Sequence, residues 1–185
     1  MDAYTAAVSE PLPPGSMPRR LATKEQATAL ASAVRLRILR MTYYHPLTNC
    51  EIARRLDRDP ATTLHHVRKL VDIGLLEVLP VRRGTRGARE IPYRATGLFW
   101  TLDPAPDGDP VGRNEAMLEA FLGEVADVGV ERLSQARLVV RLDDAQVQEF
   151  RERLDLLLNE FAARRVDPDA AGVAVYVAMH PSPEF

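Results

Sequence analysis

Polar and cationic side chains recur along one side of the segment from Pro60 to Ile73. If Val67 is placed at the centre of a buried helical face, Thr62, His65 and Lys69 fall on the outward side. Hydroxyl, imidazole and ammonium groups hydrogen-bond to the edges of DNA bases, so these three residues are predicted base contacts. Three neighbours are predicted to lie near backbone phosphates: Thr63, His66 and Arg68.

A second group of cations follows in the stretch RRGTRGAR, residues 82–89. The β-prone residues on both sides of it, 75–81 and 90–95, predict a β-hairpin with a basic tip. Pro80 and Pro92 each remove a backbone donor, so edge positions are expected for both. Guanidinium groups bind phosphates or a narrow minor groove, which predicts a backbone clamp made by Arg82, Arg83, Arg86 and Arg89. A solvated loop with incidental charge is the alternative.

Local signals predict the helices that would position these side chains. Thr48 and Glu51 form a capping box at the start of a short helix. Asp59 and Pro60 mark the start of the next helix, and Gly74 marks its end. The pattern is that of a helix-turn-helix. Two further helices are predicted upstream, one that begins at Thr23 and one over residues 33–41.

The second half predicts a helix, a strand, a helix and a strand, over residues 114–130, 136–142, 143–165 and 172–179. The first of these helices carries an apolar stripe, which can be core, a ligand pocket or a dimer interface. Apolar residues of the second helix recur at spacings of three and four, which marks a packing seam: Val147, Phe150, Leu154, Leu157 and Phe161.

The charge of −2 on the 185 residues hides an asymmetry. Residues 18–100 hold 16 Lys and Arg against 7 Asp and Glu, whereas residues 101–185 hold 8 against 17. A basic module attracts phosphates, and an acidic one avoids them. The predicted fold class is α+β, with a disordered arm (1–20), a winged helix-turn-helix DNA-binding domain (21–97) and a smaller C-terminal dimerisation or effector region (98–185).

Several classes of protein are not expected. No apolar run approaches the roughly 20 residues that span a membrane, and the N-terminus does not resemble a signal peptide. The single cysteine, Cys50, excludes an internal disulfide and fits a cytoplasmic location. It is interpreted as a small core residue or, alternatively, a redox thiol. The chain has no nucleophile elbow, phosphate-binding loop or dinucleotide fingerprint, so neither an enzyme nor a cofactor is expected.

From Leu30 to Ala95 the sequence resembles the winged-helix domain of ArsR-like (arsenic-repressor-type) bacterial transcription regulators. The resemblance is carried by ALASAVRLRILRM, by CEIARRLDRDPATTLHHVRKLVDIGLLE and by PYRATG. It is similar to actinobacterial members in which an acidic, helical half follows the winged helix. The resemblance implies a homodimer that binds double-stranded DNA at a pseudo-palindromic operator, usually as a repressor.

Metal-sensing members of this family carry two cysteines as C-x-C at the start of the helix before the DNA-reading helix. Here Thr48 stands at the first of these positions and Cys50 at the second. One thiolate cannot make a thiol-rich site within the chain. No histidine lies between His66 and His180, so the C-terminal His/Asp site of other members is also missing, and no metal site is expected.

Two other functions remain open. Regulation can depend on a small organic effector held in the C-terminal half, lined by Trp100, Phe121, Phe150, Phe161 and Tyr176. Alternatively, the winged helix is a protein-interaction module without a specific DNA site. The charge asymmetry favours DNA, and the leading hypothesis is a homodimeric transcription regulator.

Overall fold

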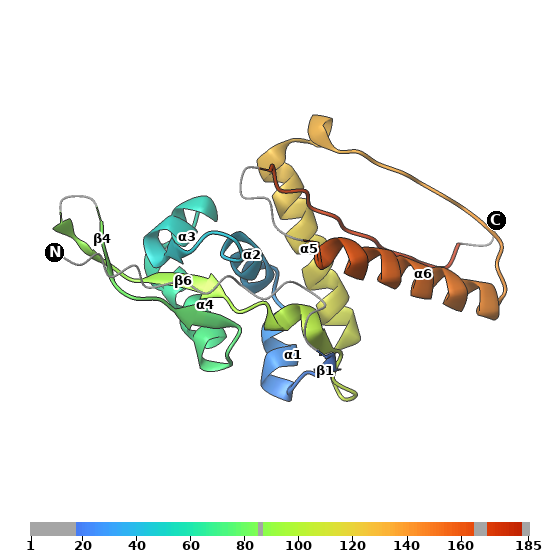
Figure 1. Cartoon of the computed structure of the whole chain (residues 1–185), viewed down its shortest axis with the longest axis horizontal. Coiled ribbons are helices and arrows are strands. Elements are labelled where there is room, and N and C mark those ends of the chain that lie inside the picture. Colours follow the sequence, from blue (N-terminus) through green and yellow to red (C-terminus); the bar gives the residue numbers. More distant parts are fainter. Residues whose placement is uncertain (1–17, 85–86, 165–169, 183–185) are drawn as a thin grey trace. The chain divides into compact units, whose positions relative to one another are not determined.

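The computed structural model describes residues 18–84, 87–164 and 170–182. The chain divides into two compact units, Met1–Ala120 (unit 1) and Phe121–Phe185 (unit 2), and each is described by itself (Figure 1). Residues 1–17 of the predicted arm and Arg86 of the predicted clamp lie outside the described residues.

Unit 1 contains the four predicted helices: α1 (Lys24–Leu30), α2 (Ala33–Met41), α3 (Asn49–Arg55) and α4 (Pro60–Asp72). Capping boxes begin α1 at Thr23, the predicted start of that helix, and α3 at Thr48, where the box was predicted. Asp59 caps α4, because its Oδ2 accepts a hydrogen bond from the Thr62 N–H at 2.8 Å. Gly74 follows α4 with φ +74°, the left-handed conformation that favours glycine.

Short strands complete the winged part of unit 1. An antiparallel sheet has the order β2 (Leu47–Thr48), β6 (Pro92–Ala95), β3 (Leu76–Val78). Beyond it, β4 (Arg82–Arg83) pairs with β5 (Arg89–Glu90), and we call this hairpin the wing. The predicted edge position of Pro92 was wrong, since β6 is the central strand. Pro92 lies at the first position of β6, where it pairs with Thr48, and its carbonyl still accepts a hydrogen bond from the Leu79 N–H at 2.9 Å on the other side.

A parallel strand pair was not predicted. β1 (Arg20–Leu21) pairs with β7 (Leu102–Asp103), which follows the 3-10 helix η2 (Leu98–Thr101). Arg19 Nε also donates to Asp103 Oδ1 at 2.7 Å. The predicted disordered arm therefore does not extend to residue 20. The partner strand lies about 80 residues further along the chain, so no local pattern could indicate the pairing.

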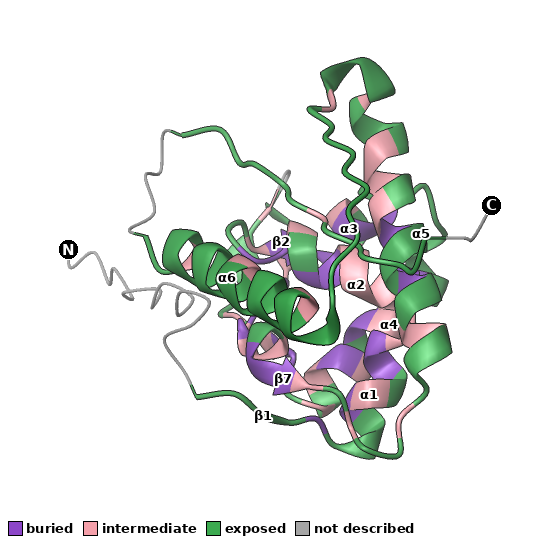
Figure 2. Cartoon of the chain, turned by 90° about the vertical axis from the view of Figure 1, so that its right-hand side faces the viewer, coloured by how far each residue is buried: buried purple, intermediate pink, exposed green. Residues whose placement is uncertain are grey.

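The core of unit 1 lies where α2, α3, α4 and β3 meet (purple in Figure 2). Six aliphatic side chains there are fully or almost fully buried: Ile38, Leu39, Ile52, Val67, Leu70 and Leu75. Cys50 is exposed, so its interpretation as a core residue was wrong. It precedes the buried Ile52 by two residues, and a rotation of about 200° turns it away from the core.

Helix α5 (Pro110–Val128) crosses from unit 1 into unit 2. Unit 2 continues with a 3-10 turn, η3 (Val130–Arg132), and α6 (Asp144–Ala162), which begins at the predicted position with a capping box of Asp143 and Gln146. The strands predicted over residues 136–142 and 172–179 were wrong, because neither segment joins a ladder with any described residue. The ring of Tyr176 instead stacks on Phe121, with centroids 4.8 Å apart. Among the described residues, no helix combines the length and the hydropathy needed to cross a membrane.

The turn between α3 and α4 predicts how stability responds to substitution. Asp57 follows α3 with φ +50°, a conformation that costs an L-residue about 1 kcal/mol. Asp57→Gly removes this cost but adds roughly 0.5 kcal/mol of unfolded-chain entropy, so the free energy of unfolding should rise by about 0.5 kcal/mol. Asp57→Val should lower it by about 1 kcal/mol, since β-branched residues avoid this region. Urea unfolding measures both, and destabilisation by glycine would contradict the assigned turn.

Candidate nucleic-acid interface

The turn that joins α3 to α4 is held by backbone and side-chain hydrogen bonds. The Arg58 N–H donates to the Ala53 carbonyl at 2.9 Å, which closes the end of α3. Asn49 Nδ2 donates to the Pro60 carbonyl at 2.9 Å, which ties the start of α3 to the start of α4. Because both ends of α3 are held in this way, the angle between the two helices is determined by the turn and by the core beneath it.

Helix α4 has a buried face and an exposed polar face. Thr62, His65 and Arg68 are exposed and Lys69 is half-buried, so these predicted contacts lie on the accessible side. Thr63 is fully buried and its hydroxyl donates to the Asp59 carbonyl at 2.9 Å. The prediction that Thr63 lies near phosphates was therefore wrong. Its position one helical turn before Val67 places it in the core.

His66 lies at the edge of the two faces and is half-buried. Its Nδ1 is buried and has no hydrogen-bond partner among the described residues. Burial lowers the pKa of this imidazole below its ordinary value, and nearby positive charge lowers it further, from Arg35, His65, Arg58 and Lys69. The charges of Arg35, Arg58 and Lys69 make the surroundings of His66 electropositive and favour its neutral form.

One arginine of the wing contacts the helix-turn-helix directly. Arg82 Nη2 donates to both carboxylate oxygens of Glu51, at 2.8 and 2.9 Å. Arg82 Nε donates to Glu90 Oε2 on the opposite strand at 3.0 Å. Partial burial raises the pKa of Glu51, but the hydrogen bonds from Thr48 and the charge of Arg82 outweigh it and lower the pKa overall. Arg82 is thus engaged with two carboxylates and positions the wing.

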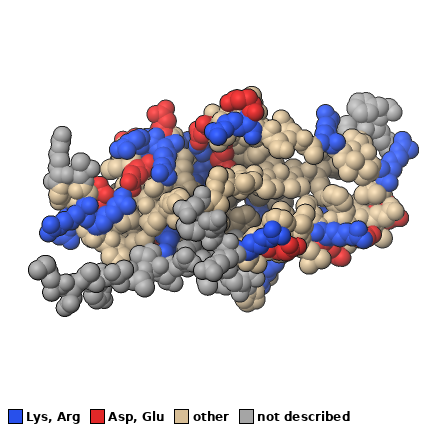
Figure 3. Space-filling view, turned by 45° about the horizontal axis from the view of Figure 1, so that its top comes forward, with Lys and Arg blue, Asp and Glu red and all other residues tan. Residues whose placement is uncertain are grey.

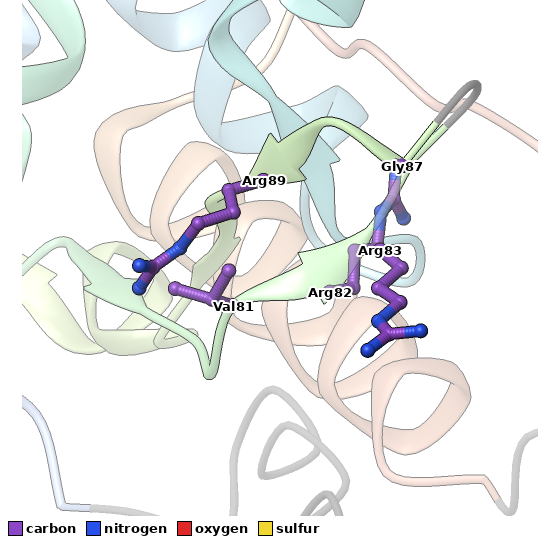
Figure 4. Close-up of a pocket in the computed structure, with 5 residues that line it drawn as sticks. All are labelled: Val81, Arg82, Arg83, Gly87 and Arg89. Carbon is purple, nitrogen blue, oxygen red and sulfur yellow. The ribbon is translucent and has the colours of Figure 1, made fainter.

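Arg83 and Arg89 are the other two predicted clamp residues that the structure describes. Both are exposed, and neither forms an ion pair with a described residue. In Figure 4 they line a hollow together with Val81, Arg82 and Gly87, and their guanidinium groups project away from the ribbon in different directions. Figure 3 shows Lys and Arg side chains gathered over the end of unit 1 that carries the wing (left). These two arginines are available to bind phosphates.

Two contributions were not foreseen from the sequence. Glu51 was predicted only as a helix cap, whereas it also holds the wing through Arg82. Arg58 is exposed in the turn directly before α4, and its charge reaches His66. The position of Arg58 beside the predicted N-cap Asp59 was the available signal for a cation near the start of α4.

The described residues contain no group of three or more His, Cys, Asp or Glu side chains placed to hold a metal ion. His65 and His66 are adjacent in α4, with ring centroids 6.0 Å apart, and Cys50 is exposed on α3. The polar groups of this surface are instead arranged along α4 and the wing.

This arrangement matches a known domain. Residues 30–78 match the family model of a helix-turn-helix domain. The chain therefore carries this domain in its N-terminal part, within an α+β fold, and the domain is one that DNA-binding transcription regulators use. No curated protein matches the sequence.

Solved structures with detectable similarity include two mutants of ZitR from Lactococcus lactis. One, in the apo form, is 21% identical, with 73% of this chain and 86% of that chain covered and a TM-score of 0.30. The other is 19% identical, with 84% and 87% covered and a TM-score of 0.26. A MarR family protein of Mycobacterium tuberculosis, in complex with salicylic acid, is 22% identical, with 72% and 84% covered and a TM-score of 0.32.

The lowered pKa of His66 predicts a pH dependence of stability. The unfolded chain takes up a proton near pH 6.5, whereas the folded state resists protonation until a lower pH. The stability contributed by neutral His66 is therefore fully present above about pH 7 and is lost as the pH falls through 6.5 toward the folded-state pKa. Urea unfolding at pH 7.5 and 5.5 should show a smaller loss for His66→Gln than for the unsubstituted protein. An equal decrease in unfolding free energy for the two proteins would show that protonation of His66 does not destabilise the folded state.

The different environments of Arg82 and Arg83 predict different effects of substitution. Arg83→Ala should reduce the slope of log affinity against log salt for any DNA duplex by about 0.9, with no change in unfolding free energy. Arg82→Ala should lower the unfolding free energy by up to about 1 kcal/mol and change the salt slope less, because its charge is already compensated. Fluorescence anisotropy with a salt series and urea unfolding measure the two quantities. A full slope loss for Arg82→Ala, without destabilisation, would make it a phosphate contact instead.

Proposed function

We propose that the protein is a sequence-specific transcription regulator that inserts α4 into the major groove of DNA. Thr62, His65 and Lys69 contact base edges. Arg68 of α4 and Arg83 of the wing are among the cations that bind phosphates. The proposal extends the helix-turn-helix match over residues 30–78 to the particular side chains of this chain.

One observation carries the proposal. The exposed polar face of α4 and two exposed wing arginines, Arg83 and Arg89, belong to a single folded unit, and Glu51 and Arg82 connect them. If the α4 and wing side chains were only solvent-exposed surface residues, α3 and the wing would not need to be joined by the Glu51–Arg82 contact. A protein that reads DNA needs this contact, because base contacts carry sequence information only when phosphate contacts fix the position of the protein along the duplex. Arg86, between the two arginines, belongs to the same proposed clamp.

The protein acts as a homodimer on a pseudo-palindromic operator, since two identical α4 helices related by a two-fold axis read two inverted half-sites. Repression is the proposed direction of regulation, and it rests on the resemblance to ArsR-like regulators. We place the protein in the cytoplasm, where its DNA is accessible and its single cysteine stays reduced. We propose no enzymatic activity.

Selection of bound duplexes from a random DNA pool tests the proposal. The expected result is an inverted repeat whose half-sites are about 10 base pairs apart, centre to centre. A binding activity without any motif, which vanishes at modest salt, would overturn it and favour the protein-interaction alternative. A motif that is recovered only with an added metabolite would favour the effector alternative.

The selected duplex then tests the role of α4. His65→Ala should reduce discrimination at one base position per half-site by about tenfold, because a good base contact contributes about 1–3 kcal/mol of discrimination. Arg83→Ala should weaken the selected and a scrambled duplex by the same factor, because a phosphate contact does not distinguish sequences. Anisotropy titrations with single-base variants measure both, and unchanged discrimination in His65→Ala would remove His65 from the proposed base contacts.

A further inference from the structure

Unit 2 has no core of its own. None of its described residues, 121–164 and 170–182, is buried, whereas unit 1 encloses a set of fully buried aliphatic side chains. Figure 2 shows α6 almost entirely in the colour of exposed residues. Sixteen large hydrophobic side chains of the described part of unit 2 are 38% to 87% exposed. An apolar surface of this size, left in water, normally marks an interface.

Helix α6 carries the most regular part of this surface. Its seam of Val147, Phe150, Leu154, Leu157 and Phe161 has the alternating three- and four-residue spacing by which two helices pack side by side. The outer members remain accessible, with Phe150 41%, Leu157 50% and Phe161 55% exposed. A second helix with the same spacing would cover them.

Two segments add strand-forming potential. Residues 136–142 (ARLVVRL) and 172–179 (GVAVYVAM) are rich in β-branched residues, yet no ladder pairs either of them within the described chain. Both are largely exposed, with Val139 at 70% and Val173 at 87%. Figure 1 draws them as long segments without helix or strand. Unpaired, β-prone backbone of this kind pairs readily with another chain.

The chemistry of unit 2 limits what can cover it. Residues 121–185 hold 7 Lys and Arg against 12 Asp and Glu. A surface with this net negative charge repels the phosphates of nucleic acids and anionic lipids. A protein partner is therefore favoured. Exposed apolar surface is unfavourable in water at all times. The protein that buries it must therefore be present whenever this chain is present. A second copy meets that condition, as in obligate homodimers, whose interfaces resemble a domain core cut in half.

The exposed area is also sufficient. Sixteen large side chains, each at least 38% exposed, offer on the order of 1,000 Å², against about 800 Å² that each partner buries in a standard interface. We propose that unit 2 is the dimer interface, in which the α6 seams of two copies pack together and residues 136–142 and 172–179 pair with the same segments of the second copy. The inference rests on the proposed function only for the expectation of two-fold symmetry.

Light scattering after size-exclusion chromatography of the full chain tests this interface. The unsubstituted protein should have twice the 20.6 kDa mass of one chain. Leu157→Glu, in the seam, should raise the dimer dissociation constant at least 100-fold and give a monomer. Asn159→Glu is the matched control, because it places the same charge two residues away, outside the seam, and it should stay dimeric. A monomeric unsubstituted protein, or a dimer that survives Leu157→Glu, would overturn the inference.

Hydrogen exchange on the unsubstituted protein covers the case in which Leu157→Glu fails to fold. Amides of residues 136–142 and 172–179 should be protected in the dimer and should lose protection on dilution. Rapid exchange of both segments at every concentration would overturn the strand pairing. The result is separable from DNA binding: a dimer that selects no DNA motif overturns only the proposed function, whereas a dimer that selects an inverted repeat but survives Leu157→Glu overturns only the interface.

Discussion

The Glu51 carboxylate is the group that joins the start of α3 to the wing in the proposed DNA-binding surface of unit 1. It accepts the Thr48 N–H at 2.7 Å, which caps α3, and both of its oxygens accept from Arg82 of the wing. Helix α3 also packs against α4, and its Ile52 is fully buried. This side chain therefore adds a direct contact between the helix-turn-helix and the wing to the one that the sheet β2-β6-β3 provides. Substitution of Glu51 would remove a helix cap and a wing anchor together, so the two roles cannot be measured by one variant.

The net charge of unit 1 is a poor guide to how many cations can bind DNA. Arg35 donates to the carbonyls at the end of α1, Arg82 holds the wing, and Arg94 is buried in an ion pair with Glu77. These three charges maintain the fold. A cation that is already compensated releases few counterions when DNA binds, whereas exposed cations such as Arg83 and Arg89 release them. The salt dependence of binding should therefore reflect the second group.

The two units differ in their cores and in the kind of surface that they expose. Unit 1 has a core of buried aliphatic side chains and presents one polar helix face, which in the proposed function contacts a single half-site. Unit 2 has no buried residue in its described part and presents apolar surface. A regulator that reads an inverted repeat needs both properties, because two half-sites require two copies of α4 in a defined relation. The proposed interface supplies that relation by burying what one chain leaves exposed.

The sequence alone determined the features whose physical causes are local. The helix starts at Thr23, Thr48 and Asp143, and the stop at Gly74, follow from hydrogen bonds and backbone preferences within about four residues. The periodicity of α4 likewise indicated which of its residues face outward, and the buried Thr63 lies on the face that contains Val67, so its listing among the phosphate contacts was not a consequence of the periodicity. Tertiary structure decided what distant partners control. The pairing of β1 with β7, the pairing of β6 with β2 and the attachment of Arg82 to Glu51 join residues that are 31 to 82 positions apart. The strands expected in unit 2 failed for the same physical reason, because a strand is stable only with a partner, and the described chain supplies none to either segment.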